Sequence, residues 1–238
     1  MSYRLVRTSC GVSVDMGNGS QLYLHHIMGI GRNYSEHAKE QGAAVPDRPM
    51  VFTKNPMSVS VSGDEIVVPK ICQEKPQVDF EGELAVVIGK DARDVAADKV
   101  FEHVLGYCVA NDVSARWWQK EGSGGQFYRG KSFDTFCPLG PVVTPVSEIK
   151  DPQDLRLVTR VNGTVMQDDS TAKMTFSVKE LIADLSRGMT LGAGTVILTG
   201  TPAGVGMART PQIWLKDGDL VEIEITGLGK IVNRVRYE

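Results

Sequence analysis

The stretch that most restricts the fold is "VDFEGELAVVIG", residues 78 to 89. Its run from Leu84 to Ile88 is apolar at every position, which is typical of a strand buried on both faces and so of a layered β structure. Glu81 and Glu83 precede this run two residues apart, and side chains at that spacing point to one face of a strand. Two anions that enter an interior repel each other and lose hydration, so a cation or a proton has to compensate them. A solvated strand edge is the alternative, and this stretch alone leaves both open.

Many more short strand-like runs, separated by turn signals, fill the chain. They recur at "MVFTK", "EIVVP", "VLGYCVAND", "LRLVTRVNGTVMQ", "GTVILTG" and "DLVEIEITGLGKIVNRV". Asn-Gly pairs at residues 18–19 and 162–163 are typical of hairpin turns, and residues 227–229 indicate a third hairpin. Strands therefore dominate, and we predict a β-rich α+β fold with a few short helices.

Three stretches have the residue spacing of short helices. These are "NYSEHAKEQGA", with Ser35 as N-cap and Gly42 past its end, "AADKVFEHVL", and "SVKELIADLSRG" with Gly188 as its stop. The chain has no repeat, low-complexity tract or linker. We predict a small N-terminal β segment over residues 1–26, followed by one main domain over residues 27–238.

Charge and cysteine usage exclude several classes of function. The formal net charge of −3 gives no electrostatic reason to bind nucleic acid or an acidic membrane surface. No apolar segment approaches the roughly 20 residues that span a bilayer, and the start of the chain has no hydrophobic signal core. The four cysteines are scattered without a CxxC pair, which argues against a zinc site or a disulfide framework. We therefore predict a cytoplasmic protein whose partners are small molecules.

"GQFYRGKS", residues 125 to 132, matches the phosphate-loop pattern G-x-x-x-x-G-K-[ST]. That loop has to leave a strand and open a helix, whereas here a loop-like "QKEGSGG" precedes it. Pro138 and Pro141 follow it and prevent a helix of useful length. We predict that it binds no nucleotide. Lys131 can still serve as a cation beside an anionic substrate, and the alternative is a solvated surface lysine.

"GIGRNYSEHAKE" places His37 and Glu40 three residues apart on one face of a helix. A carboxylate that orients an imidazole makes a general base able to activate water, although such a pair can also be a simple surface ion pair. Arg32 and Tyr34, just before the helix, are candidates for holding a substrate carboxylate. Capping and packing are the alternatives for these two residues.

"YCVANDVSARWW" puts Asp112 at the end of an apolar strand, where side chains from different strands can converge. Asp112 can then join Glu81 and Glu83, or form an ordinary Asx turn. Three carboxylates without a histidine or cysteine ligand favour a hard cation such as Mg²⁺, Mn²⁺ or Ca²⁺ over zinc.

Six stretches in this order resemble the fumarylacetoacetate hydrolase family: "GRNYSEHAKE", "DFEGELAVVIGK", "ANDVSAR", "RGKSFDTFCPLGP", "TRVNGTVMQ" and "ILTGTPAGVG". The resemblance runs from about Ile27 to the C-terminus and is to the short, single-domain branch. It implies a mixed β-roll or β-sandwich that pairs into homodimers.

The resemblance also implies roles for individual residues. The metal ligands would be Glu81, Glu83 and Asp112, holding Mg²⁺ or Mn²⁺, with Ca²⁺ as an inactive occupant. His37 and Glu40 would activate water, while Lys131 and Thr201 would face the substrate. Gly82, between two ligands, departs from a regular strand and indicates a bulge or a close approach.

The implied activity is cleavage of a C–C bond in a 2,4-diketo acid, such as an acylpyruvate or fumarylpyruvate, through a metal-stabilised enolate. Arg32, Tyr34, Arg116 and Gln119 are candidates for gripping the substrate, with structural salt bridges as the alternative for the arginines. Decarboxylation of oxaloacetate or keto–enol tautomerisation would use the same metal site. A non-enzymatic binding module that retains the fold is an alternative of another class.

Overall fold

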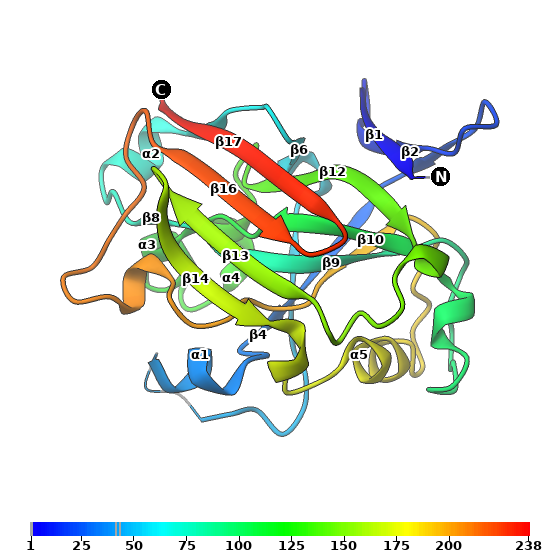
Figure 1. Cartoon of the computed structure of the whole chain (residues 1–238). Coiled ribbons are helices and arrows are strands. Elements are labelled where there is room, and N and C mark those ends of the chain that lie inside the picture. Colours follow the sequence, from blue (N-terminus) through cyan, green and yellow to red (C-terminus); the bar gives the residue numbers. More distant parts are fainter. Residues whose placement is uncertain (1, 41, 43) are drawn as a thin grey trace.

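Two β-sheets pack against each other in the computed structural model, which describes residues 2–40, 42 and 44–238 (Figure 1). The larger, mixed sheet runs in the order β3-β2-β1-β12-β10-β9-β15-β4-β5, with β6 paired to β12. Its strands are β1 (Tyr3–Thr8), β2 (Gly11–Asp15), β3 (Gln21–Tyr23), β4 (His26–Gly31), β5 (Met50–Lys54), β6 (Val59–Val61), β9 (Gly82–Ile88), β10 (Val104–Asn111), β12 (Cys137–Pro145) and β15 (Thr195–Leu198).

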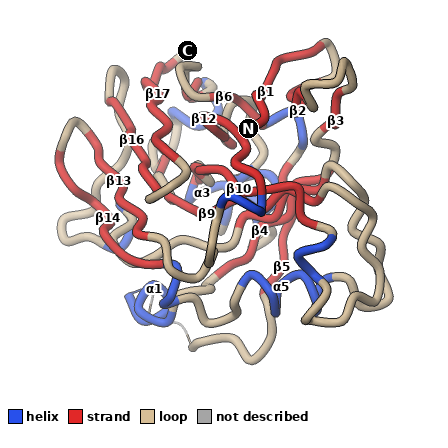
Figure 2. Tube along the Cα trace, turned by 45° about the vertical axis from the view of Figure 1, so that its right-hand side comes forward, coloured by secondary structure: helices blue, strands red, loops and turns tan. Residues whose placement is uncertain are grey.

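The smaller sheet runs in the order β14-β13-β16-β17-β7. It is built from β7 (Ile66–Val68), β13 (Arg156–Val161), β14 (Thr164–Ser170), β16 (Leu220–Ile225) and β17 (Gly229–Tyr237). β8 (Val78–Asp79) and β11 (Ser114–Ala115) form a separate two-stranded ladder. Figure 2 shows the smaller sheet standing beside β9 and β10 of the larger one.

The helices are short, and only one reaches eight residues among those that the structure describes. They are α1 (Ser35–Glu40), α2 (Lys70–Gln73), α3 (Arg116–Gln119), α4 (Phe127–Lys131) and α5 (Val178–Leu185). Single 3₁₀ turns lie at Pro56–Ser58, Val100–Glu102, Glu121–Ser123, Val146–Glu148, Thr171–Lys173 and Gly206–Ala208. The predicted β-rich α+β class with few short helices is confirmed.

β9 is buried at all seven of its positions, as its apolar run predicted. Because side chains alternate along a strand, Leu84, Val86 and Ile88 enter the core shared with the smaller sheet. Ala85 and Val87 enter a second core on the opposite face of the larger sheet. β9 therefore contributes side chains to both cores, one on each of its faces.

The predicted hairpins are confirmed. Residues 18–19 lie in the turn between β2 and β3, and residues 227–228 lie in the turn between β16 and β17, which begins at Gly229. Asn162 and Gly163 join β13 to β14 with φ of 50° and 78°, the left-handed backbone that an Asn-Gly turn supplies at little steric cost. Two of the predicted helices form, and α5 begins with a capping box between Ser177 and Glu180.

The prediction of a helix over residues 96–105 is wrong. This stretch contains turns and one 3₁₀ turn, and β10 begins at Val104, which pairs with Ile88 of β9. Val104 and Leu105, the last apolar residues of the helical pattern, belong to β10, while Val100 is buried within the 3₁₀ turn. Pairing beside β9 therefore decides the end of the stretch. The N-terminal strands β1 to β3 also continue the larger sheet, through the pairing of β1 with β12.

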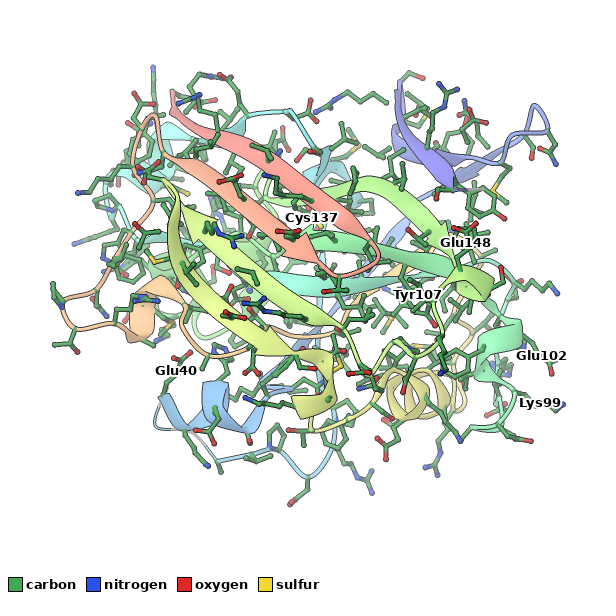
Figure 3. The ribbon with its side chains drawn as sticks, in the orientation of Figure 1. Glu40, Lys99, Glu102, Tyr107, Cys137 and Glu148 are labelled. Carbon is green, nitrogen blue, oxygen red and sulfur yellow. The ribbon has the colours of Figure 1, made fainter. Side chains whose placement is uncertain are left out.

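All four cysteines are free, and three of them are buried, including Cys137 (Figure 3). Burial raises the pKa of the Cys137 thiol to about 12, so it stays protonated at neutral pH. No helix in the described part of the chain is long and apolar enough to cross a membrane.

Candidate active site

Three carboxylates meet where β9 begins and β10 ends. The antiparallel pairing puts Asn111 opposite Gly82, so Asp112, the next residue, donates its backbone N–H to Glu81 O at 2.9 Å. One oxygen from each of Glu81, Glu83 and Asp112 lies within 4.8 Å of the others, and no side chain of the three is more than slightly exposed. The structure thus brings together the predicted ligand set, and excludes the solvated edge as the place of the two glutamates.

Two buried lysines compensate this acidic triad. Lys131 Nζ lies 2.5 Å from Glu81 Oε2 and 2.6 Å from Asp112 Oδ2. Lys54 Nζ lies 2.5 Å from Asp112 Oδ1, so both oxygens of Asp112 are paired. Burial opposes the charge on Lys131, but the Asp112 and Glu81 carboxylates prevail and raise the pKa of this lysine. Lys131 is therefore a buried cation of the site and not a solvated surface lysine.

Arg116 is held next to the triad by two carboxylates. Its Nε and Nη2 donate to Asp79 Oδ2 at 2.9 and 2.7 Å, and Nη2 lies 2.7 Å from Glu81 Oε1. Its Nη1 donates to Gln119 Oε1 at 3.0 Å. Burial opposes ionisation of Glu81, but the Arg116 and Lys131 charges prevail and hold the pKa of Glu81 below its ordinary value.

The cluster contains one more acid than base. Its acids are Asp79, Glu81, Glu83 and Asp112, and its bases are Lys54, Arg116 and Lys131. Glu83 forms no ion pair with the residues that the structure describes, and its Oε2 accepts the Gly200 N–H at 2.7 Å. Burial, together with the Asp112 and Glu81 charges, raises the pKa of Glu83 well above its ordinary value. The excess negative charge is therefore offset when Glu83 keeps a proton or when the cluster takes up a cation.

A hard divalent cation fits these residues. The ammonium group of Lys131 already sits between Glu81 and Asp112, so two of the three carboxylates have a positive charge between them. The donors are oxygen atoms only, the set that Mg²⁺, Mn²⁺ and Ca²⁺ prefer. That Glu81, Glu83 and Asp112 are metal ligands remains a prediction.

The predicted His37–Glu40 pair forms on α1. His37 Nδ1 lies 2.7 Å from Glu40 Oε1, with His37 only 3% exposed, so this is not a surface ion pair. Glu40 Oε2 accepts the Gly204 N–H at 2.9 Å, and Figure 3 shows Glu40 extending from α1 toward the loop after β15. The carboxylate therefore fixes both the imidazole ring and that loop, which is the arrangement that orients a general base.

A cavity of about 170 Å³ lies over the triad. His37, Glu81, Glu83 and Lys131 line it, together with four of the five predicted substrate contacts: Arg32, Arg116, Gln119 and Thr201. Its remaining walls include the apolar residues Ile30, Met50, Phe52, Phe127 and Met207. The cavity therefore combines two carboxylates of the acidic triad, an oriented histidine and cationic groups in one small space.

Tyr34, the fifth predicted substrate contact, does not line this cavity. It is 1% exposed and packs in the core, where its backbone bridges to Met174. Its hydroxyl has no hydrogen-bond partner within the described part of the chain. Burial and the Glu83 and Asp169 charges raise the pKa of Tyr34 above its ordinary value. The packing alternative fits Tyr34 better than a substrate contact does.

The phosphate-loop pattern has none of the surroundings it would need. Residues 127–131 form the short helix α4, whose last residue, Lys131, is buried against the triad. The next regular element is the strand β12, so in the described part of the chain no helix opens directly after this loop to hold a phosphate at its N-terminus. The structure supports the sequence argument against nucleotide binding.

Sequence reasoning missed Lys54, Asp79 and Gln167. Asp79, Glu81 and Glu83 are spaced two apart, so the alternation that joined the two glutamates also includes Asp79. Lys54 is a charged residue at the end of the apolar strand β5, which is the signal that singled out Asp112. Gln167 ends the stretch "VNGTVMQ", and nothing in its local sequence indicates its partners.

Comparison with known proteins finds a matching protein family and similar relatives. The family model described as "Fumarylacetoacetate (FAA) hydrolase C-terminal" matches residues 26–236. The chain is 46% identical over 212 residues to oxaloacetate tautomerase YisK of Bacillus subtilis, covering 88% of this chain and 69% of that protein. It is 47% identical over 209 residues to the human mitochondrial oxaloacetate tautomerase FAHD2A, covering 88% of this chain and 66% of that protein. The chain thus spans about two thirds of the length of these relatives.

A solved structure resembles the whole chain. The fumarylacetoacetate hydrolase from Exiguobacterium antarcticum superposes with a TM-score of 0.84 at 34% identity and covers 100% of both chains. The predicted fold of the fumarylacetoacetate hydrolase type is therefore confirmed.

Proposed function

This chain belongs to the fumarylacetoacetate hydrolase family, and from that membership we propose that it is a metal-dependent enzyme that interconverts the keto and enol forms of oxaloacetate or a similar 2-oxo acid. The observation that carries the proposal is the meeting of His37, Lys131 and the acidic triad in one cavity. Tautomerisation needs a group that removes and returns a proton, and positive charge beside the oxygen that becomes negative. Both requirements are met by neighbouring side chains.

Glu81, Glu83 and Asp112 would hold Mg²⁺ or Mn²⁺, which when bound supplies a Lewis acid that stabilises negative charge on the substrate's keto oxygen. Their net negative charge and oxygen-only donors support this choice of cation. Ca²⁺ could also bind to such donors, as an inactive occupant.

His37 would act as the general base. It would take the proton from the carbon between the keto group and the distal carboxylate, and Glu40, 2.7 Å from Nδ1, would stabilise the imidazolium that results. His37 would then donate this proton to the keto oxygen, which gives the enol. In the reverse direction His37 would take the enol O–H proton and donate it to the carbon, so atoms and charge balance. Lys131 would stabilise the negative oxygen while the proton is away.

Arg32 lines the cavity and would bind a carboxylate of the substrate. Arg116 is less suited to that role, because its guanidinium is bound by Asp79, Glu81 and Gln119. We propose that Arg116 holds the triad in place, which is the structural alternative recognised from the sequence.

Hydrolysis of a 2,4-diketo acid, the activity favoured from the sequence, is the second candidate. The oriented His37–Glu40 pair supports it, since the same base could deprotonate a water that attacks the distal carbonyl of an acylpyruvate. Decarboxylation of oxaloacetate would need only the cationic groups. The names of the two relatives favour tautomerisation over both.

One set of assays separates these outcomes. The decay of enol-oxaloacetate absorbance is followed with Mg²⁺, with Mn²⁺ and with a chelator, while pyruvate release is measured in the same samples and on a panel of acylpyruvates. We expect metal-dependent enol decay without matching pyruvate release. The matched control is His25→Ala, since His25 bonds to Ala193 O outside the cavity, and it should keep full activity where His37→Ala loses it. Pyruvate released in step with substrate loss would replace the proposal with decarboxylation or hydrolysis, and inactivity on every substrate would favour a binding module.

The wider assignments rest on the sequence. We propose a homodimer that acts on a small 2-oxo acid, in a chain whose N-terminal segment, residues 1–26, precedes the catalytic domain at residues 27–238. A cytoplasmic location is the corresponding proposal for the compartment, although the human relative's name places that protein in mitochondria. Size-exclusion chromatography with light scattering tests the dimer.

A further inference from the structure

A buried glutamine of the smaller sheet reaches into the proposed metal site. Gln167 lies on β14 and is 1% exposed. Its side chain forms hydrogen bonds with two segments of the site. Its Oε1 accepts the Gly82 N–H at 3.0 Å. Its Nε2 donates to Thr201 Oγ1 at 2.7 Å and to Pro202 O at 2.8 Å. Because Gly82 offers a donor and Pro202 an acceptor, the amide can have only one orientation.

We propose that Gln167 is a positioning residue that fixes the peptide between the two glutamate ligands and sets the direction of the Thr201 hydroxyl. The inference rests on the proposed function, since it assigns Gln167 a role toward the metal that Glu81 and Glu83 would hold. Gln167 touches neither the cavity nor the ligand oxygens in the contacts above, so it acts through other residues.

Gly82 is the residue that connects Glu81 to Glu83, and both of its backbone polar atoms are held. Its N–H is bound by Gln167 and its carbonyl accepts the Thr201 hydroxyl at 2.9 Å. Consecutive side chains of a strand point to opposite faces, so Glu81 and Glu83 point together only if Gly82 keeps this place. Holding both polar atoms of Gly82 therefore fixes the relative position of the two carboxylates.

The Thr201 hydroxyl is held from both sides within this network. A hydroxyl has one hydrogen, and here it is donated to Gly82 O, while the Gln167 amide donates to the same hydroxyl oxygen. Thr201 can then offer a substrate only an acceptor, which a substrate carboxylate cannot use. The hydrogen of the Thr201 hydroxyl is therefore used by the scaffold of the site, and toward the cavity this oxygen can only accept, for example from an enol hydroxyl.

The loop that contains Thr201 also holds the carboxylate of Glu83. Gly200, next to Thr201, donates its N–H to Glu83 Oε2 at 2.7 Å. Gln167 holds Thr201 and Pro202, so the loop that positions the Glu83 carboxylate is itself tied to β14. Both glutamates thus depend on one amide from the other sheet, much as outer partners orient the ligands of a metal.

The test measures Mn²⁺ affinity from the electron paramagnetic resonance signal of free Mn²⁺, which does not depend on turnover. Gln167→Met has nearly the same shape and no amide, and should weaken Mn²⁺ binding by about 10- to 100-fold, the usual effect of losing such an outer partner. Gln153→Met is the matched control. Gln153 also joins two segments, accepting from Val178 N at 2.7 Å and donating to Thr171 O at 2.9 Å, but lies outside the cavity lining. It should leave Mn²⁺ affinity unchanged.

A second pair of variants decides the matter if Gln167→Met does not fold. Thr201→Ser keeps the hydroxyl and should keep Mn²⁺ affinity, while the isosteric Thr201→Val should lose about as much as Gln167→Met. Combined, Gln167→Met and Thr201→Val should weaken binding hardly more than either alone, because both act through Gly82.

Wild-type affinity in Gln167→Met, or equal affinity in Thr201→Val and Thr201→Ser, would overturn the inference and leave the proposed function standing. Wild-type protein that binds no Mn²⁺ would overturn the proposed function and this inference with it.

Discussion

Substituting Gly82 by alanine tests how closely the smaller sheet approaches the glutamate ligands. A Cβ at this position would lie 2.3 Å from Thr159 Oγ1, 3.1 Å from Leu157 Cδ2 and 3.2 Å from Gln167 Oε1. All three neighbours belong to β13 or β14. The Thr159 side chain is fully buried and branched at Cβ, so it cannot swing away freely. The close approach that the sequence indicated at Gly82 is therefore present.

Two opposing effects set the size of the change. Forcing an extra methyl group into a packed core costs about 1–3 kcal/mol. Alanine also restricts the unfolded chain, which returns about 0.4–1 kcal/mol. The packing cost prevails, and we expect a net loss of about 1–2 kcal/mol in the free energy of unfolding. In a chain of this size that loss lowers the Tm by roughly 2–8 °C.

Thermal denaturation of the metal-free protein measures this, with a second substitution to identify the cause. Thr159→Ala removes the atom at 2.3 Å, so the Gly82→Ala/Thr159→Ala variant should be more stable than the sum of the single changes by about 1 kcal/mol. Gly192→Ala is the control. A Cβ at this position would come no nearer to another atom than 3.3 Å, from a His25 ring atom, so the Tm should shift little. An unchanged Tm in Gly82→Ala, or strictly additive losses in the double variant, would refute the packing argument.

Four further predictions concern the acids of the site, its general base and the phosphate-loop pattern. Asp112→Asn should abolish metal-dependent turnover and also destabilise the fold by about 3–5 kcal/mol, because it leaves two buried lysines short of a carboxylate. Adding Lys54→Met should restore part of that stability, seen in urea denaturation, without restoring metal binding; a double variant no more stable than the single one would contradict this. The raised pKa of Glu83 means that the metal-free fold keeps a proton that the unfolded chain releases above about pH 4.3, so its stability should fall as the pH rises above that value, and Glu83→Gln should flatten the profile. His37→Ala should lower turnover by roughly 10²-fold or more while calorimetry shows unchanged metal affinity. Calorimetry with ATP should show no binding, and micromolar affinity lost in Lys131→Ala would overturn that expectation.

Much of the site follows from short-range patterns. The spacing of Glu81 and Glu83 on a strand, and of His37 and Glu40 on a helix, fixes which side chains share a face, whatever the rest of the chain does. The position of Asp112 at a strand end, and then the six family motifs, indicated that Asp112 and Lys131 belong to the same site. The structure brings Asp112 to the two glutamates because β9 and β10 pair in the register that sets Asn111 opposite Gly82. His37 from α1 and Lys131 from α4 line the cavity beside them.

Local pattern was misleading where the sheet decided the conformation. Residues 96–105 have helical spacing, yet Val104 pairs with Ile88 and the end of the stretch becomes β10. Tyr34 follows Arg32 in a motif that faces the cavity, but its ring packs in the core. Neither outcome can be seen from neighbouring residues, since each depends on an element far along the chain that buries the side chain in question.

By itself, the sequence determined the residue types of the site, because oxygen donors at strand and helix spacing define both the chemistry and the shared face. It equally determined the hairpins, since Asn-Gly turns have an intrinsic backbone preference. Only the tertiary structure decided which groups neutralise and hold those carboxylates. Lys54 meets Asp112 across 58 residues, and Gln167 meets Gly82 across 85. The first pair joins two strands of the larger sheet and the second joins the two sheets. In both, a buried charge or amide has to be satisfied by whatever group the fold brings within reach.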